Sequence, residues 1–186
     1  MTGIRNCRRC HPAVALRLAA AVIIGTVRMD IESAFAAART QRDRKGFLKR
    51  LLLGGDLETP ARWAVERRDV ERLLNSLLYD SEDLVRWRAI QAFGLIAVLK
   101  AGARIESVRE MLRRLLWAMN DESGNSIPHA PELIGEILAN VPDLIPEFAR
   151  YLPAFHDSPL YERGIGWAMS RIAAVDPEAS REFSRG

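Results

Sequence analysis

A chain of 186 residues with a formal net charge of +3 has the length of one domain that buries roughly two-thirds of its unfolded surface. Its 48% hydrophobic and 27% charged residues are ordinary for a soluble globular protein. The charge is uneven: residues 1–28 hold five arginines and no acid, 29–114 hold 17 basic and 13 acidic residues, and 115–186 hold 5 and 11. The body is bipolar, which argues against a uniformly basic nucleic-acid binder and allows head-to-tail association of copies.

Residues 1–28 form an N-terminal extension that has three interpretations. A basic start followed by an apolar run imitates a secretory signal, and Ala34-Phe35-Ala36 imitates its cleavage site. Arg17 interrupts the apolar run, which is also too short and too charged to span a membrane. The favoured interpretation is translated upstream sequence, with Met29 as the true start.

Both cysteines of the chain, Cys7 and Cys10, stand in this extension as C-R-R-C, with His11 beside them. A single CxxC supplies half of a tetrahedral zinc site, and the remaining ligands would have to be histidines. Only His129 and His156 are left elsewhere in the chain, so the motif does not by itself indicate a metal site.

Residues 30–67 are expected to form an N-terminal helical cap. The run from Asp30 to about Leu53 favours helix and is closed by two glycines. A short helix follows, with Thr59 as its cap and Pro60 at its first position. Such a cap would cover the apolar end of a stack of repeats.

The stretch from Asp80 to Ile96 predicts the central helix of the chain. Asp80 and Ser81 are suited to cap its start, where acidic residues also favour the helix dipole. An apolar face recurs at helical spacing, and Gly94 lies beside it, so another helix is expected to pack closely here. The residues of this face are Val85, Ala89, Ala92 and Ile96.

Copies of this helix recur along the chain. A shift of 41 residues aligns Ala130, Gly135 and Ile137 with Ala89, Gly94 and Ile96. A third, weaker copy follows Asp157. Three repeats of paired helices are therefore predicted, at about 68–102, 105–140 and 142–174, within a domain of residues 29–186. The first helix of each repeat is marked by an apolar stripe, the third one comprising Leu144, Phe148, Tyr151, Leu152 and Phe155.

The pattern V-R-x-x-A-x-x-A-x-G-x-I, together with R-R-L-L-W-A-M-N-D-E-S-G, A-P-E-L-I-G-E-I and R-G-I-G-W-A-M-S-R-I-A, resembles the HEAT-like repeat family. The combination is most similar to small HEAT-repeat proteins of sulfate-reducing and related anaerobic bacteria, over about residues 68–174. The resemblance implies an all-α fold, an α-solenoid of the armadillo type, and no assigned activity. Those proteins carry a Gly-Trp-rich segment where this chain has N-S-I-P-H.

The favoured functional hypothesis is a scaffold that binds another protein, with no catalysis and no cofactor. Solenoids present a ribbon of second helices, and exposed Trp and Arg are typical anchors of interfaces. The same residues would otherwise cap helices, bridge neighbouring repeats or fill the core. The candidates for partner binding are Arg86, Trp87, Trp117, Asn120, Asp121, Glu122, Arg163 and Trp167.

Two alternatives come from other classes. A metal-binding or cofactor-binding HEAT-like enzyme or accessory protein would use the carboxylate and histidine cluster of residues 120–136, which comprises Asp121, Glu122, His129, Glu132 and Glu136. The candidates for metal ligands are His129, Glu132 and Glu136, the two glutamates being one helical turn apart. A nucleic-acid binder would use Arg62, Arg67, Arg68, Arg72, Arg104, Arg109, Arg113 and Arg114, but the acidic C-terminal third would repel phosphates. We expect a cytoplasmic protein without membrane contact, able to form homo-oligomers.

Overall fold

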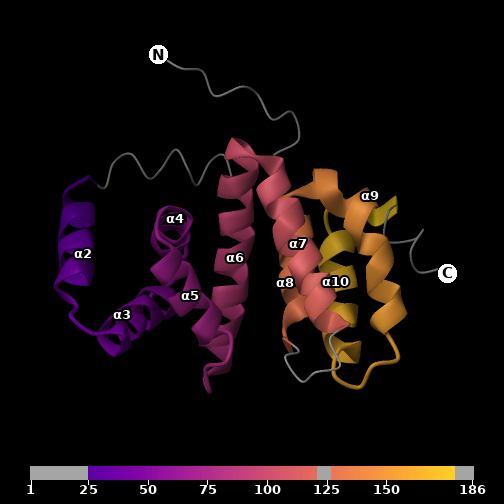
Figure 1. The fold of residues 1–186 in the computed structure, drawn as a ribbon, viewed down its shortest axis with the longest axis horizontal. Coiled ribbons are helices and arrows are strands. Elements are labelled where there is room, and N and C mark those ends of the chain that lie inside the picture. The colour runs from indigo at the N-terminus through magenta and orange to yellow at the C-terminus, as the bar shows by residue number, and fades with distance from the viewer. Residues whose placement is uncertain (1–24, 121–126, 179–186) are drawn as a thin grey trace, which may run out of the picture.

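The computed structural model describes residues 25–120 and 127–178, in which helices follow one another without a β-strand (Figure 1). The predicted all-α class is confirmed for these residues. None of the helices described has the length and apolar content needed to cross a membrane. The C-R-R-C motif and the candidates Asp121 and Glu122 lie outside the described residues. The first helices are α2 (Gly25–Ala37), α3 (Gln41–Leu53), α4 (Glu58–Glu66), α5 (Arg68–Leu77) and α6 (Asp83–Ala103).

The second half continues with α7 (Ile105–Met119), α8 (Ala130–Asn140), η2 (Pro142–Leu144), α9 (Ile145–Phe148), η3 (Ala149–Phe155) and α10 (Glu162–Ala173). Four helices, α4, α6, α8 and α10, lie side by side in that order. The others cover this row: α3 contacts α5 and α6, α7 contacts α6 and α8, and η3 contacts α10 (Figure 1). Each helix of the row is thus preceded in the chain by a helix of the covering layer.

Helix α6 carries the predicted apolar face. Val85, Ala89, Ala92 and Ile96 are all fully buried, as their helical spacing requires. The predicted cap is wrong in detail. The helix begins at Asp83, its N-cap Glu82 makes no side-chain cap hydrogen bond, and Asp80 Oδ1 instead accepts a hydrogen bond from the Glu82 amide at 3.0 Å.

Close packing within the row depends on glycines. A Cβ atom placed on Gly94 would lie 2.6 Å from Asn140 Nδ2 and 2.9 Å from Glu136 Cγ on α8. A Cβ on Gly135 would lie 2.5 Å from Ala168 Cα on α10, which is backbone and cannot rotate away. The small residues that predicted a close helix approach therefore mark two successive contacts, α6 with α8 and α8 with α10.

Two groups of buried side chains form the core. The N-terminal core joins α2 to α6 and also includes Leu133 of α8, while the C-terminal core joins α7 to α10 and includes Ala97 of α6. Met111, Leu115 and Ile127 are partly buried and pack against both cores. Helices α6 and α8 are therefore shared between the two halves of the molecule.

The N-terminal segment differs from its prediction. The expected single helical run is two helices, because Thr40 takes an extended conformation and its Oγ1 caps α3 by accepting from the Asp43 amide at 3.1 Å. Thr59 is not a cap: α4 begins one residue earlier, and the Thr59 amide donates to Asp56 Oδ1 at 3.0 Å.

The third covering element also differs. Its apolar stripe predicted one regular helix, but η2, α9 and η3 form a broken series from Pro142 to Phe155. Proline lacks an amide hydrogen, and Pro142, Pro146 and Pro153 interrupt the α-helical hydrogen bonds. Tyr151, which the apolar stripe placed among core residues, is 45% exposed, whereas Leu152 beside it is fully buried.

Replacing Gly135 by Ala should destabilise the fold, because the new Cβ meets the backbone of α10. Overpacking of this kind costs about 1–3 kcal/mol, so we expect urea denaturation to give a free energy of unfolding lower by that amount.

The matched control is Gly166→Ala on α10, the helix that faces Gly135, where a Cβ would meet nothing within 4 Å. Alanine favours helix over glycine, so this variant should gain about 0.5–1 kcal/mol. Equal effects of the two substitutions would contradict the close contact of α8 and α10.

Candidate functional site

Two carboxylates lie inside the row of helices. Glu132 and Glu136 are one turn apart on α8, as predicted, and only 9% and 5% of their surface is exposed. Glycines on the neighbouring helices make room for them: Gly164 of α10 lies against the Glu132 carboxylate, and Gly94 of α6 lies against the Glu136 side chain. Buried acids are rare unless they are paired, so their partners decide what they do.

Glu136 is fully engaged by neighbouring side chains. Arg171 of α10 donates from Nε to Oε2 at 2.9 Å and from Nη2 to Oε1 at 3.1 Å. Asn140 Nδ2 donates to Oε1 at 3.0 Å and to the Glu136 carbonyl at 2.8 Å. This two-pronged ion pair ties α8 to α10 and leaves Glu136 occupied in a structural role.

Glu132 is less well partnered. Its Oε1 lies 3.4 Å from His129 Nδ1, and its Oε2 is buried with no hydrogen-bond partner among the described residues. The structure thus brings together two of the three metal candidates, His129 and Glu132, while Glu136 pairs with Arg171. Within residues 25–120 and 127–178, no group of three His, Cys, Asp or Glu side chains is arranged to hold a metal ion.

Trp87 and Trp167 form an aromatic pair between two helices that flank α8. Trp87 projects from α6 and Trp167 from α10, with ring centroids 5.0 Å apart and ring planes at 42°. Trp87 remains 38% exposed and Trp167 is half-buried. Both rings are therefore partly engaged in holding the row together, and one edge of the pair faces solvent.

The other candidates for partner binding are not gathered at the aromatic pair. Trp117, near the end of α7, is 71% exposed, and Arg163 at the start of α10 is exposed. Asn120 Nδ2 donates to the Leu116 carbonyl at 2.9 Å, so the Asn120 side chain bonds the C-terminal turn of α7. Arg86 also turns inward, donating to Asp83 and to the Asp80 carbonyl.

Exposed apolar side chains stand in or beside the turns where one covering helix ends and the next helix of the row begins. The α5–α6 turn, the end of α7 and the η3–α10 turn all lie at the lower end of the molecule in Figure 1. We call this surface the turn end; it comprises Tyr79, Leu84, Trp87, Trp117 and Leu160, which are 60%, 46%, 38%, 71% and 50% exposed.

Three members of the turn end, Tyr79, Leu84 and Leu160, were not among the candidates chosen from the sequence. Tyr79 immediately precedes Asp80, and Leu160 sits between Pro159 and Tyr161, outside the apolar stripes of the helices. For Tyr79 and Leu160, the signal that could have identified them is an apolar residue in a turn between two helical stripes; Leu84, in the first turn of α6, lies off the apolar face of that helix.

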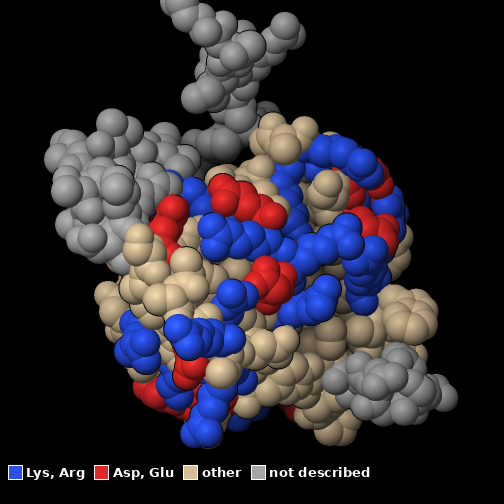
Figure 2. All heavy atoms as spheres, turned by 60° about the vertical axis from the view of Figure 1, so that its left-hand side comes forward, with Lys and Arg blue, Asp and Glu red and all other residues tan. Residues whose placement is uncertain are grey.

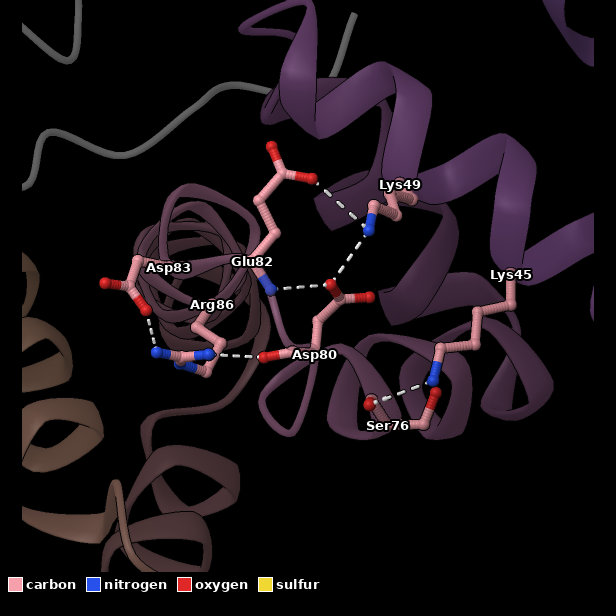
Figure 3. Close-up of polar contacts among 7 residues, drawn as sticks. All are labelled: Lys45, Lys49, Ser76, Asp80, Glu82, Asp83 and Arg86. Atoms are coloured by element: carbon pink, nitrogen blue, oxygen red, sulfur yellow. Dashed lines mark hydrogen bonds and ion pairs between the residues drawn. The ribbon is translucent and has the colours of Figure 1, made fainter.

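Ion pairs fix the α5–α6 turn to helix α3 (Figure 3). Lys49 Nζ reaches across from α3 to Asp80 Oδ1 at 2.8 Å and to Glu82 Oε2 at 3.4 Å. Lys45, one turn earlier, donates to the Ser76 carbonyl at 3.1 Å. The hydrogen bond from Lys49 lowers the pKa of Asp80, and the same bond raises the pKa of Lys49.

Basic residues are numerous on the N-terminal side of the molecule but are interleaved with acids. Figure 2 shows Lys and Arg spheres running across this face with Asp and Glu among them. Arg109 bonds Glu147 at 2.7 Å, Arg113 bonds Glu106 at 2.6 Å and Arg114 bonds Glu110 at 2.9 Å. Three of the arginines considered for nucleic-acid binding are therefore already neutralised by carboxylates.

Comparison with models of known protein families finds no match, and comparison with solved structures finds none either. Among curated proteins, an uncharacterised protein of Archaeoglobus fulgidus is 27% identical over 107 residues, which cover 57% of this chain. The same alignment covers 55% of that protein, so the chain spans about half of its length. The likeness carries no information about an activity.

Glu136→Gln should destabilise the fold, because it removes the charge from a buried carboxylate that accepts two hydrogen bonds from Arg171. Charge-assisted hydrogen bonds contribute about 1.5–3 kcal/mol, and we expect a loss of this order in the free energy of unfolding, measured by urea denaturation.

Glu132→Gln is the matched control one turn away. Its Oε2 has no described partner, so the substitution removes the cost of burying an incompletely paired charge. The free energy of unfolding should therefore stay unchanged or rise. An equal loss in both variants would mean that Glu132 has an internal role equivalent to that of Glu136.

Asp80→Asn should alter the response of stability to acid. The folded-state pKa of Asp80 is lowered, so its contribution is present above its unfolded pKa and is lost as pH falls through the folded value. Thermal unfolding between about pH 7 and pH 2 should show the variant less stable at neutral pH, with the difference shrinking below about pH 5.

Asp143→Asn, which changes an exposed acid on η2, is the control and should follow the wild type. A constant difference between Asp80→Asn and wild type at every pH would show that Asp80 does not act through its ionised form.

Proposed function

We propose that the chain is a protein-interaction scaffold, built as a HEAT-like α-solenoid of the armadillo type and working in the cytoplasm. Three features support the architecture: helices alternate between a row and a covering layer, the most extensive contacts within the row are between successive helices, and glycines stand at equivalent places in successive contacts. Stacks of this kind bury a continuous core and expose extended surfaces to partners.

The observation that carries the proposal is the exposure of Trp117 at the turn end. Large apolar side chains that remain exposed together are typical of interaction surfaces, and tryptophan is the residue most enriched among their energetic anchors. Trp117 is 71% exposed, whereas Trp63, of the same residue type, is buried in the N-terminal core at 3%. Packing within the described residues therefore leaves most of the Trp117 ring available to a partner.

The arrangement also favours binding over catalysis. Among the described residues Glu136 accepts hydrogen bonds from Arg171 and Asn140, and only His129 lies near Glu132, so the two buried carboxylates do not converge on a common catalytic centre. The wide spacing of the exposed residues over three successive turns suits a protein surface.

Photo-crosslinking tests the proposal directly. The amino acid p-benzoylphenylalanine is placed singly at Tyr79, Trp117 or Leu160, and in control variants at Arg72 or Ala103, which are exposed away from the turn end. We expect one protein to be crosslinked from all three turn-end positions in the native cell and from neither control position.

Trp117→Ala should then weaken the recovered complex at least tenfold, as the loss of an interface anchor does. Circular dichroism checks that the variant is folded. Crosslinks from the control positions alone, or an unchanged affinity of Trp117→Ala, would contradict the proposed surface.

A further inference from the structure

Carboxylates surround the exposed apolar side chains of the turn end. In the α5–α6 turn, Glu82 and Asp83 stand between Tyr79 and Leu84, and their side chains are 46% and 78% exposed. In the η3–α10 turn, Asp157 and Glu162 flank Leu160, and the Asp157 side chain is fully exposed. Apolar and acidic side chains thus alternate along this surface.

Two cations near the turn end, Lys49 and Arg86, are committed to partners inside the molecule, whereas Arg163 at the start of α10 is exposed. Lys49 is held by Asp80 and Glu82, and Arg86 by Asp83 and the Asp80 carbonyl. A carboxylate has about four acceptor positions, so one internal ion pair leaves acceptors that point to solvent. The surface consequently offers hydrogen-bond acceptors and negative charge to a partner, together with apolar area.

The α6–α7 turn lies at the opposite end of the molecule in Figure 1, and Arg104 is exposed there. Lys100, in the last turn of α6, is paired with Glu71 at 2.8 Å. A positively charged partner would therefore be attracted to the exposed carboxylates of the turn end rather than to this turn.

We infer that the turn end binds a basic amphipathic segment of a partner protein, whose apolar side chains cover Tyr79, Leu84, Trp117 and Leu160 and whose Lys and Arg side chains pair with the flanking carboxylates. This inference rests on the proposed scaffold function and specifies the chemistry of the partner. An acidic segment is excluded by like-charge repulsion, and a purely apolar segment leaves the carboxylates without partners.

The test uses the full chain and three 18-residue peptides. One peptide places Leu and Lys at helical spacing, the second replaces Lys by Glu on the same apolar pattern, and the third scrambles the Leu and Lys positions. Isothermal titration calorimetry should show that the amphipathic Leu/Lys peptide binds at least tenfold more tightly than either of the others, with an affinity that falls as salt is raised.

Two matched triple variants locate the site. Asp83→Asn, Asp157→Asn and Glu162→Gln together remove three charges at the turn end and should weaken the Leu/Lys peptide at least tenfold. Glu66→Gln, Glu110→Gln and Asp143→Asn remove three exposed charges elsewhere and should leave the affinity within twofold of wild type. Trp117→Ala should also weaken binding at least tenfold, which separates the apolar contribution from charge.

Equal binding of the Leu/Lys and Leu/Glu peptides, no binding of either, or equal weakening by the two triple variants would overturn the inference. The proposed function has a separate outcome. A crosslinked partner whose contact segment is acidic or uncharged would contradict the inference of a basic segment but not the proposed scaffold function. Crosslinks from the control positions alone would contradict the scaffold function itself.

Discussion

The close approach of α8 to its two neighbours is the constraint on which the rest of the structure depends. Gly94 lets α8 approach α6, and Gly135 lets α10 approach α8, so closely that a Cβ atom at either glycine would clash with the neighbouring helix. Enclosed in this way, α8 buries every residue from Ala130 to Ala139, including two glutamates. The ion pair between Glu136 and Arg171 follows from that enclosure, since an unpaired charge there would be costly.

Sequence periodicity predicted the row of helices well because helical spacing and small residues report directly on packing. Val85 and Ile96 are buried and Gly94 lies at a helix contact, as expected. Periodicity failed where backbone chemistry overrides it. Three prolines broke the third covering helix, and the extended conformation of Thr40 split the N-terminal run in two.

The candidate site was harder to predict, because exposure depends on which neighbours a helix acquires. Trp63, Trp87 and Trp117 are alike in the sequence, yet they are 3%, 38% and 71% exposed. Glu132 and Glu136 suggested a ligand site on a helix surface, but α8 has helices on both sides and no such surface. Sequence spacing gives the face of a helix and does not give the number of helices that cover it.

The pair formed by Trp87 and Trp167 joins two helices that are not neighbours in the row. In a stack where each element touches only the next, bending at one contact is felt by the adjacent element alone. Here the two rings meet across α8, so α6 and α10 cannot spread apart without separating them. The pair therefore links α6 to α10 directly, in addition to the contacts that each of these helices makes with α8.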